Sequence, residues 1–458
     1  MASDLRQRHA MPGSAAQHSI HIRGGRVVDP GAGLDAQVDL FVAEGKVAGV
    51  AQAPAGFLPD LTIDANGLVV CPGLVDLSAR LREPGQEHKG TIASESRAAV
   101  RGGITTLCFP PDTDPVVDTP AVVELIRSRA EQEGMARVVA LGAMTQGLEG
   151  SQLSEMGALR RAGCVAVSNG SRPITDTHVM RRAMEYAATH GLSVFLSPRD
   201  PWLSQRGCVH EGVVSVRLGL PGIPESAETT VLARDLMLVE ETGVRAHFCQ
   251  LSTARGVDLI RAARAQGLPV TADVTAHHLH LCEMDVLGFD PQCHVMPPLR
   301  SPKDRDGLRA GIADGSLSAI CSDHQPHERD AKCAPFCATA PGISGLETLL
   351  PLTVRLVDEG LLNLSDALSR VTCLPAQVLG IAAGSLLSGR AADICIFDPQ
   401  AHWRVSVDRL TSAGRNSPFD GWELSARVTH TLVGGRLVHA ASTASVQPEV
   451  QPGVSRTT

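Results

Sequence analysis

CPGLVDLSARLREPG, residues 71–85, joins a short apolar run to a charged turn, and this combination decides the fold. Residues 74–77 predict a buried strand. Ser78, Ala79 and Arg80 follow it directly, and the turn of residues 82–85 comes next. Polar side chains at the C-terminal end of a buried strand are where an α/β barrel carries its chemistry. We therefore take Ser78 and Arg80 as candidate site residues of such a barrel.

Strand and helix patterns alternate from residue 73 to about residue 375. Strand patterns occupy residues 74–77, 104–109, 137–143, 164–167, 193–196, 245–249, 269–274 and 317–321. Helical patterns lie between most of them. For the helix near residues 225–243 we expect Ser226 as the N-cap, Glu228 in the first turn and Gly243 as the stop. Eight strands with intervening helices over about 300 residues predict an α/β protein with a (β/α)8 TIM-like barrel.

Both ends of the chain carry β patterns instead. Residues 19–72 contain short alternating runs separated by hairpin signals at residues 24–25 and 44–45, and β patterning returns in residues 376–442. We expect these two parts to pack together as one small composite β domain. Residues 1–18 and 443–458 are expected to be flexible tails.

Composition and charge exclude several classes of function. The chain has 458 residues, of which 43% are hydrophobic and 20% charged, and its net charge is -8. No run of Lys and Arg is present to serve a nucleic-acid surface. No apolar stretch reaches the length of about 18 residues that a transmembrane helix needs, and the first 18 residues lack the apolar core of a signal peptide. We therefore expect a cytoplasmic protein.

The twelve cysteines are spread along the chain, and several fall inside strand patterns. Free cysteine in such positions behaves as a small buried hydrophobe, so no disulfide framework is expected. Cys333 and Cys337 form the most closely spaced pair, but no second pair lies nearby to complete a zinc site. We interpret this pair as part of a plain loop.

Six blocks of the sequence resemble the bacterial type I dihydroorotases of the amidohydrolase superfamily. They are VDLSARLREPGQEHKG (75–90), AAVRGGITTLCFPPDTDPVVDTP (98–120), LGLPGIPESAE (218–228), VTAHHL (274–279), PPLR (297–300) and SDHQPH (322–327). The resemblance extends from roughly residue 20 to residue 440. It implies an amidohydrolase-type barrel that binds zinc and closes N-carbamoyl-aspartate to dihydroorotate, together with a composite β domain.

The metal-ligand positions that the resemblance implies are almost all altered. They are occupied here by Ser78, Arg80, Asn169, Ser197 (Leu196 if the alignment shifts by one), Gln250 and Asp323. Only the aspartate is a family ligand, and the others are neutral or cationic groups that bind zinc poorly or not at all. We therefore expect no metal and no other cofactor. We also expect Arg80 to replace the metal's charge by pairing with Asp323, which would otherwise be an uncompensated buried charge.

The substrate positions that the resemblance implies are altered in part. Asp112 and Met296 stand where the family has asparagines, and a carboxylate at residue 112 should repel a dianionic substrate. Arg82, His324 and His327 are retained. Arg82 has two interpretations, either as a carboxylate receptor or as half of an internal ion pair with Glu83 or Asp323.

A dense histidine group, His277, His278 and His280, raises the alternative of a relocated metal site. The resemblance implies that the first two belong to a barrel loop and are not metal ligands. We therefore favour hydrogen-bonded structural histidines.

Three hypotheses follow for function. The first is a pseudoenzyme: a dihydroorotase homologue without activity of its own. The resemblance implies that such a chain assembles with the aspartate carbamoyltransferase catalytic chain, as a hetero-oligomer in pyrimidine biosynthesis. The second is an active dihydroorotase or related cyclic amidohydrolase, of hydantoinase or allantoinase type, with an atypical site. The third is a small-molecule sensor that retains Arg82 in a reshaped pocket.

Overall fold

The structure is a computed structural model that describes residues 18–441 and 446–448. The tails expected at residues 1–18 and 443–458 lie outside the described residues, apart from residue 18 and the strand β23 (Val446–Pro448). No helix in the described ranges is long and apolar enough to cross a membrane.

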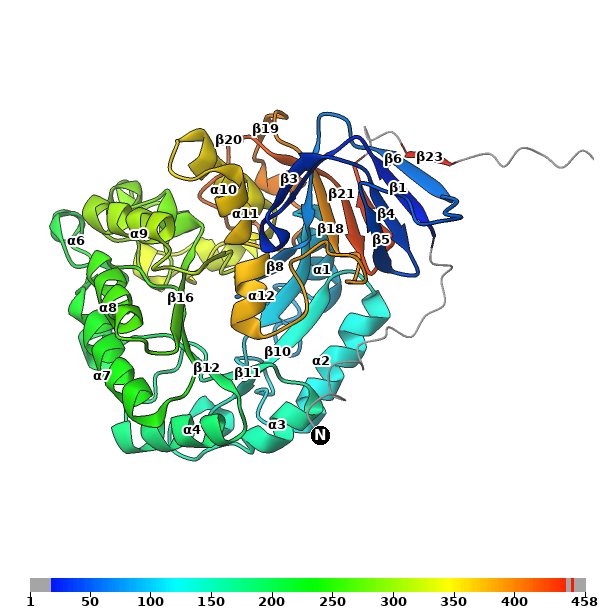
Figure 1. The fold of residues 1–458 in the computed structure, drawn as a ribbon. Coiled ribbons are helices and arrows are strands. Elements are labelled where there is room, and N and C mark those ends of the chain that lie inside the picture. The colour runs from blue at the N-terminus through cyan, green and yellow to red at the C-terminus, as the bar shows by residue number, and fades with distance from the viewer. Residues whose placement is uncertain (1–17, 442–445, 449–458) are drawn as a thin grey trace, which may run out of the picture.

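A parallel barrel forms the larger part of the described chain (Figure 1). Its eight strands are β8 (Leu74–Asp76), β9 (Ile104–Phe109), β10 (Arg137–Ala143), β11 (Ala166–Ser168), β12 (Ser193–Leu196), β15 (Ala246–Phe248), β16 (Val270–Thr275) and β17 (Ala319–Cys321). Neighbouring strands pair in this order, and a parallel bridge between Ala79 and His324 joins the first strand to the last just beyond their ends. The expected (β/α)8 barrel is confirmed.

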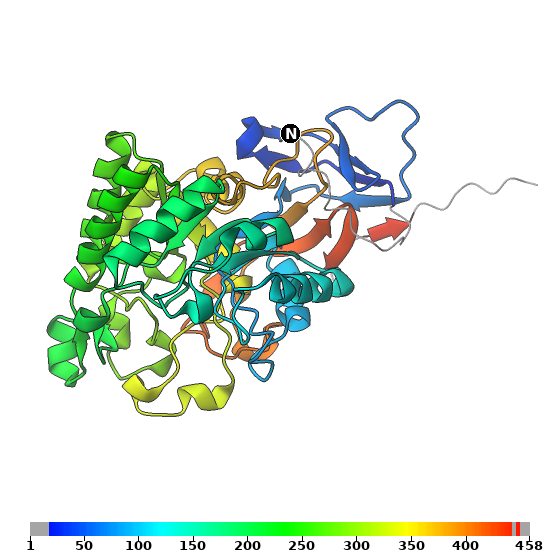
Figure 2. The ribbon, with the colours of Figure 1, turned by 90° about the horizontal axis from the view of Figure 1, so that it is seen from below.

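Helices surround the barrel, as the view from below shows (Figure 2). They are α1 (Ile92–Arg101), α2 (Pro120–Glu133), α3 (Met156–Ala162), α4 (Thr177–Thr189), α5 (Pro201–Ser204), α6 (Val213–Leu218), α7 (Ser226–Thr242), α8 (Ala254–Ala265), α9 (Pro302–Asp314), α10 (Leu349–Asp358), α11 (Leu364–Ser369) and α12 (Cys373–Leu379). The prediction for α7 was wrong by one residue at its start. Its N-cap is Glu225, because Ser226 already has helical geometry, whereas Gly243 ends it in the left-handed conformation as expected.

The inside of the barrel is a packed core closed at one end by α12. Val75, Cys108 and Phe195 from the strands pack with Ala376 and Leu379 of that helix. The residues just before α12 also bond to the first and last barrel strands. The N–H groups of residues 75 and 320 donate to the carbonyls of residues 371 and 370. The opposite end, where the strands finish, is therefore the end left for a site.

Strands from both chain ends build the β domain, at the upper right of Figure 1. One sheet has the order β22-β21-β18-β7-β2-β3, and the other β23-β6-β1-β4-β5. The N-terminal strands are β1 (Ile20–Arg23), β2 (Arg26–Asp29), β3 (Leu34–Gln37), β4 (Leu40–Ala43), β5 (Lys46–Val50), β6 (Leu61–Asp64) and β7 (Val69–Pro72). The C-terminal ones are β18 (Ile394–Asp398), β21 (Arg427–Val433) and β22 (Arg436–Ala440). Because β18 lies between β7 and β21, neither end completes this domain alone.

Short elements complete the described chain. Two small strand pairs are β13 (Val209–His210) with β14 (Gly222–Ile223), and β19 (Trp403–Arg404) with β20 (Glu423–Leu424). No disulfide framework was expected, but the structure contains one disulfide, between Cys208 and Cys337, across 129 residues of sequence. The contact depends on two loops that meet only in the folded chain. Cys333 is exposed and free, so no zinc pair forms with Cys337.

Candidate functional site

A cavity of about 440 Å³ lies at the C-terminal ends of the barrel strands. Several predicted site residues line it: Arg80, Arg82, Asp112, Ser197, Gln250, Met296, Asp323 and His327. The structure therefore brings together residues from the segments after β8, β9, β12, β15, β16 and β17. Asn169 and His324 do not line this cavity, because their side chains bond to other parts of the protein.

The Arg80 guanidinium holds two carboxylates at the mouth of the barrel. Its Nη1 lies 3.3 Å from Oδ1 of Asp323, and its Nε lies 2.9 Å from Oδ2 of Asp112. All three side chains are largely buried, Arg80 being 14% exposed. Burial lowers the pKa of Arg80, but the two carboxylates outweigh it and leave that pKa above its usual range. The predicted Arg80–Asp323 pair is confirmed, and Asp112 is a second partner that the sequence did not reveal.

Asp323 has no carboxylate oxygen left without a partner. Oδ1 accepts from Ser78 Oγ at 3.0 Å as well as from Arg80, and Oδ2 accepts from the Gln325 side chain at 2.9 Å. Ser78 is thus a buried hydrogen-bond donor at the end of β8. Three protein donors therefore occupy three of the roughly four lone-pair sites of this carboxylate, which leaves little of it for a metal.

Asn169 is turned away from the cavity and holds neighbouring loops together. Its Oδ1 accepts from Thr145 Oγ1 at 2.7 Å, and its Nδ2 donates to the carbonyls of Leu148 and Arg172 at 3.3 and 2.9 Å. Ser197 and Gln250 line the cavity wall, and Gln250 has a positive φ of 49° while its N–H donates to Asp273 Oδ1. These positions therefore supply loop structure and a polar lining.

Arg82 makes neither of the two ion pairs considered for it. Its Nε donates to the Pro326 carbonyl at 3.1 Å, and its Nη2 lies 3.0 Å from His327 Nε2. The internal ion-pair interpretation was wrong because Glu83 instead pairs with Arg129 and caps α1 through the Ile92 N–H. Burial, followed by the neighbouring Arg80 charge, lowers the pKa of Arg82 to about 10.

His324 and His327 have different surroundings, although both follow β17. His324 is fully buried, with Nε2 2.9 Å from Glu95 Oε2, so it acts inside the fold and not in the cavity. His327 lines the cavity beside Arg82. Burial and the charges of Arg82 and Lys89 lower the pKa of His327 to about 3, so it is neutral at pH 7.

The histidine group at residues 277–280 is hydrogen-bonded structure. His278 Nδ1 lies 2.7 Å from Thr275 Oγ1 and its Nε2 3.2 Å from the Pro298 carbonyl, while His280 Nε2 bonds the Leu352 carbonyl at 2.8 Å. Burial lowers the pKa to about 3 for His277 and His278 and to about 4 for His280. The structural interpretation is favoured over a relocated metal site.

Two features of this region were not predicted from the sequence. Lys89, Arg172, Arg199 and Arg300 also line the cavity, and Arg199 lies just beyond the end of β12, a position that could have marked it. A second feature is a buried group of potential metal ligands, His247, Cys249 and Asp273. Both ring nitrogens of His247 are already engaged, by Thr271 at 2.8 Å and by Asp273 at 3.0 Å. We interpret the group as hydrogen-bonded core.

Comparisons with known proteins decide the family. A sequence model described as "DHOase: Dihydro-orotase-like" matches residues 67–255. A "Dihydroorotase-like protein" of Pseudomonas aeruginosa is 52% identical over 421 residues, which cover 92% of this chain and 99% of the relative. The chain belongs to the dihydroorotase-like family.

Other relatives agree with this membership. A "Dihydroorotase" of Anaeromyxobacter sp. (strain K) is 46% identical and covers 92% of this chain and 98% of its own length. Among solved structures, an L-hydantoinase from Arthrobacter aurescens superposes with a TM-score of 0.83 at 23% identity, covering 93% of this chain and 98% of its own. That similarity shows that the two chains share the barrel fold.

The residues at the barrel mouth do not fit the zinc site that the dihydroorotase resemblance implies. Among the six expected ligand positions, Asp323 alone carries a carboxylate, and its oxygens are engaged by Ser78, Arg80 and Gln325. A fixed guanidinium stands beside it, and a cation in that place repels Zn²⁺. Zinc in proteins takes thiolate, imidazole or carboxylate ligands, and Ser78, Asn169, Ser197 and Gln250 offer none of these.

Proposed function

We propose that this chain is a non-catalytic dihydroorotase-like subunit that holds an aspartate carbamoyltransferase complex together. The observation that carries the proposal is the position of Arg80, whose guanidinium bonds both Asp112 and Asp323 at the mouth of the barrel. Membership in the dihydroorotase-like family supports descent from a dihydroorotase. The choice of aspartate carbamoyltransferase as the partner rests on the resemblance to type I dihydroorotases.

The loss of chemistry follows from what a bound metal contributes to amide hydrolysis or cyclisation. A metal polarises the substrate carbonyl and lowers the pKa of its bound water, so that hydroxide is present at neutral pH. A guanidinium stays protonated and cannot act as a general base. The cavity histidine, His327, is neutral, and its Nε2 is engaged within the protein: it lies 3.0 Å from Arg82 Nη2 and 3.1 Å from the Pro341 carbonyl, and it bonds one of the two according to its tautomer. The wall residues Ser197 and Gln250 add no group able to activate water.

A retained fold without a retained site is consistent with a function carried by the surface. Of the ten large apolar side chains exposed in the described chain, seven lie between residues 202 and 289: Trp202, Leu203, Val213, Val216, Met237, Met284 and Phe289. Val213 and Val216, 80% and 82% exposed, lie on α6 at the edge of the barrel remote from the β domain (Figure 1). Concentrated exposed apolar groups are typical of protein interfaces. We place the partner surface around α6.

Co-expression with an aspartate carbamoyltransferase catalytic chain, followed by size exclusion with light scattering, tests the proposal. We expect one large complex, with transcarbamoylase activity lost when this chain is omitted. V213E/V216E should separate the two chains, because burying two carboxylates opposes association. L58E is the matched control, since Leu58 is equally exposed, at 82%, but lies outside the α6 surface. Separate elution of the wild-type chains at micromolar concentrations, with full transcarbamoylase activity, would overturn the proposal.

A further inference from the structure

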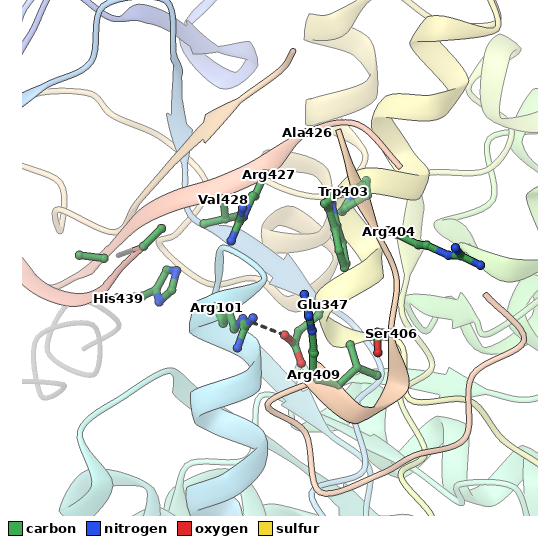
Figure 3. Close-up of a pocket in the computed structure, with 14 residues that line it drawn as sticks. Arg101, Glu347, Trp403, Arg404, Ser406, Arg409, Ala426, Arg427, Val428 and His439 are labelled. Carbon is green, nitrogen blue, oxygen red and sulfur yellow. Dashed lines mark ion pairs between the residues drawn. The ribbon is translucent and has the colours of Figure 1, made fainter. Parts of the chain in front are cut away.

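A second cavity, of about 490 Å³, opens far from the barrel mouth, between α1, the start of α10 and the C-terminal segment (Figure 3). The end of α1 contributes Arg101, the turn before α10 contributes Glu347, and β19, β21 and β22 contribute Trp403, Arg427 and His439. Its volume lies within the range of about 300–1,000 Å³ typical of small-molecule sites.

Positive charge dominates this cavity. Its lining in the described chain includes four arginines but only one carboxylate, Glu347, which pairs with Arg101 at 3.1 Å. Arg404, Arg409 and Arg427 form no ion pair with any described residue. In Figure 3 the guanidinium groups of Arg409 and Arg427 point toward the space beside the Arg101–Glu347 pair, whereas Arg404 extends away from it. Two unpaired guanidinium groups thus face one concave space.

His439 and Trp403 also line this cavity. Burial, followed by the charges of Arg101, His430 and Arg427, lowers the pKa of His439 to about 4, so this ring is neutral at pH 7 and adds no charge of its own. The indole Nε1–H of Trp403 is buried without an acceptor among the described residues. A buried donor without a partner is rare in folded proteins, which makes this wall of the cavity unusual.

We propose that this cavity binds a small molecule carrying a diphosphate group. Guanidinium groups bind phosphoryl oxygens through paired, charge-assisted hydrogen bonds, and Arg409 and Arg427 approach the space from different elements. Two adjacent phosphoryl groups match two such cations better than a single carboxylate does. Trp403 supplies an apolar wall on which a ring could lie. This site goes beyond the proposed subunit role, because it lies outside the barrel mouth and the α6 surface.

Isothermal titration calorimetry of the full chain with pyrophosphate, ATP and inorganic phosphate tests the site. We expect pyrophosphate or ATP to bind more tightly than inorganic phosphate, and R409Q/R427Q to weaken that binding at least about tenfold. R255Q/R390Q is the control, because it removes two exposed, unpaired arginines elsewhere and should leave the affinity unchanged. Circular dichroism of both variants verifies folding.

A further variant, W403F, distinguishes a diphosphate attached to a ring, as in ATP, from free pyrophosphate. W403F should weaken ATP more than pyrophosphate if a ring lies on the indole, and both equally if the ligand is diphosphate alone. Either result supports a diphosphate site. The proposal is overturned if neither pyrophosphate nor ATP binds at millimolar concentration, or if R409Q/R427Q and R255Q/R390Q weaken binding alike. Binding of a polyglutamate peptide but of neither phosphate ligand would also overturn it.

Discussion

Arg80 Nη1 lies 3.3 Å from Asp323 Oδ1, across the seam where the first barrel strand meets the last. The same guanidinium reaches Asp112, which follows the second strand. One fixed cation therefore links three loops at the place where the dihydroorotase resemblance implies two metal ions. A charge that would otherwise come from a metal is built into the chain, so the barrel mouth no longer needs a metal for its charge balance.

Removal of Arg80 should destabilise the protein strongly. R80M leaves Asp112 and Asp323 unpaired in a largely buried place, and breaking a buried pair on one side costs about 3 kcal/mol or more. Unfolding by urea measures the loss. R255Q, which removes an exposed unpaired arginine, should change stability by less than about 0.5 kcal/mol. An R80M variant as stable as R255Q would show that the Arg80–Asp112 and Arg80–Asp323 ion pairs do not contribute to stability.

Restoring the two strand-end histidines should not restore a metal site. S78H/R80H returns two ligands, but Asn169 remains bonded to Thr145, Leu148 and Arg172, and Ser197 and Gln250 offer no imidazole. We expect no stoichiometric zinc by elemental analysis of the dialysed variant. One or two zinc ions retained per chain would mean that zinc can bind at the barrel mouth without ligands from residues 169, 197 and 250.

Stability should fall as the pH drops below about 6.5. The native pKa of His278 is about 3 because the ring is buried, whereas an unfolded histidine titrates near 6.5, so the unfolded chain binds more protons in this window. This histidine alone should remove about 2 kcal/mol between pH 7 and pH 5. Unfolding free energies of H278Q should show a pH dependence smaller by that amount. The control variant R255Q changes an exposed residue that does not titrate between pH 5 and pH 7 and should keep the wild-type dependence. Equal slopes for both variants would contradict the assignment.

Glu95 should be a structural residue of the whole fold. Its fully buried carboxylate accepts from His324 at 2.9 Å, from Ser412 Oγ at 2.6 Å and from the Ala413 N–H at 3.0 Å, which ties α1 to the loop after β17 and to the C-terminal segment. E95A leaves these donors without an acceptor and should cost about 3 kcal/mol. Thermal or urea unfolding measures it against E124A, which removes a surface glutamate of α2. Equal stability of the two variants would argue against this role.

The barrel could be predicted because each of its strands produces a recognisable pattern within a short stretch of sequence. Runs such as residues 104–109 are buried along their full length, and a parallel barrel strand shows this as continuous apolar sequence. The Arg80–Asp323 pair was also predictable, since one surviving carboxylate in a barrel mouth needs a counter-charge. The pairing of Asp112 with Arg80 was not predicted, because the charge of Asp112 was considered only in relation to a substrate.

Features that depend on distant loops meeting could not be predicted. Cys208 and Cys337 are 129 residues apart, and no local pattern connects them. Arg82 was expected near an acid, but the loop geometry places it against His327 and the Pro326 carbonyl. The second cavity collects arginines from residues 101 to 427, so its positive charge appears only when the C-terminal segment folds against α1.

The measurement that tests the central claim most directly is carbamoyl-aspartate cyclisation by the purified chain in the presence of excess zinc. The account predicts a rate equal to the uncatalysed background, with and without the metal, because Arg80 occupies the site and both oxygens of Asp323 already accept hydrogen bonds from the protein. Zinc-dependent turnover well above background, from the chain alone, would contradict it.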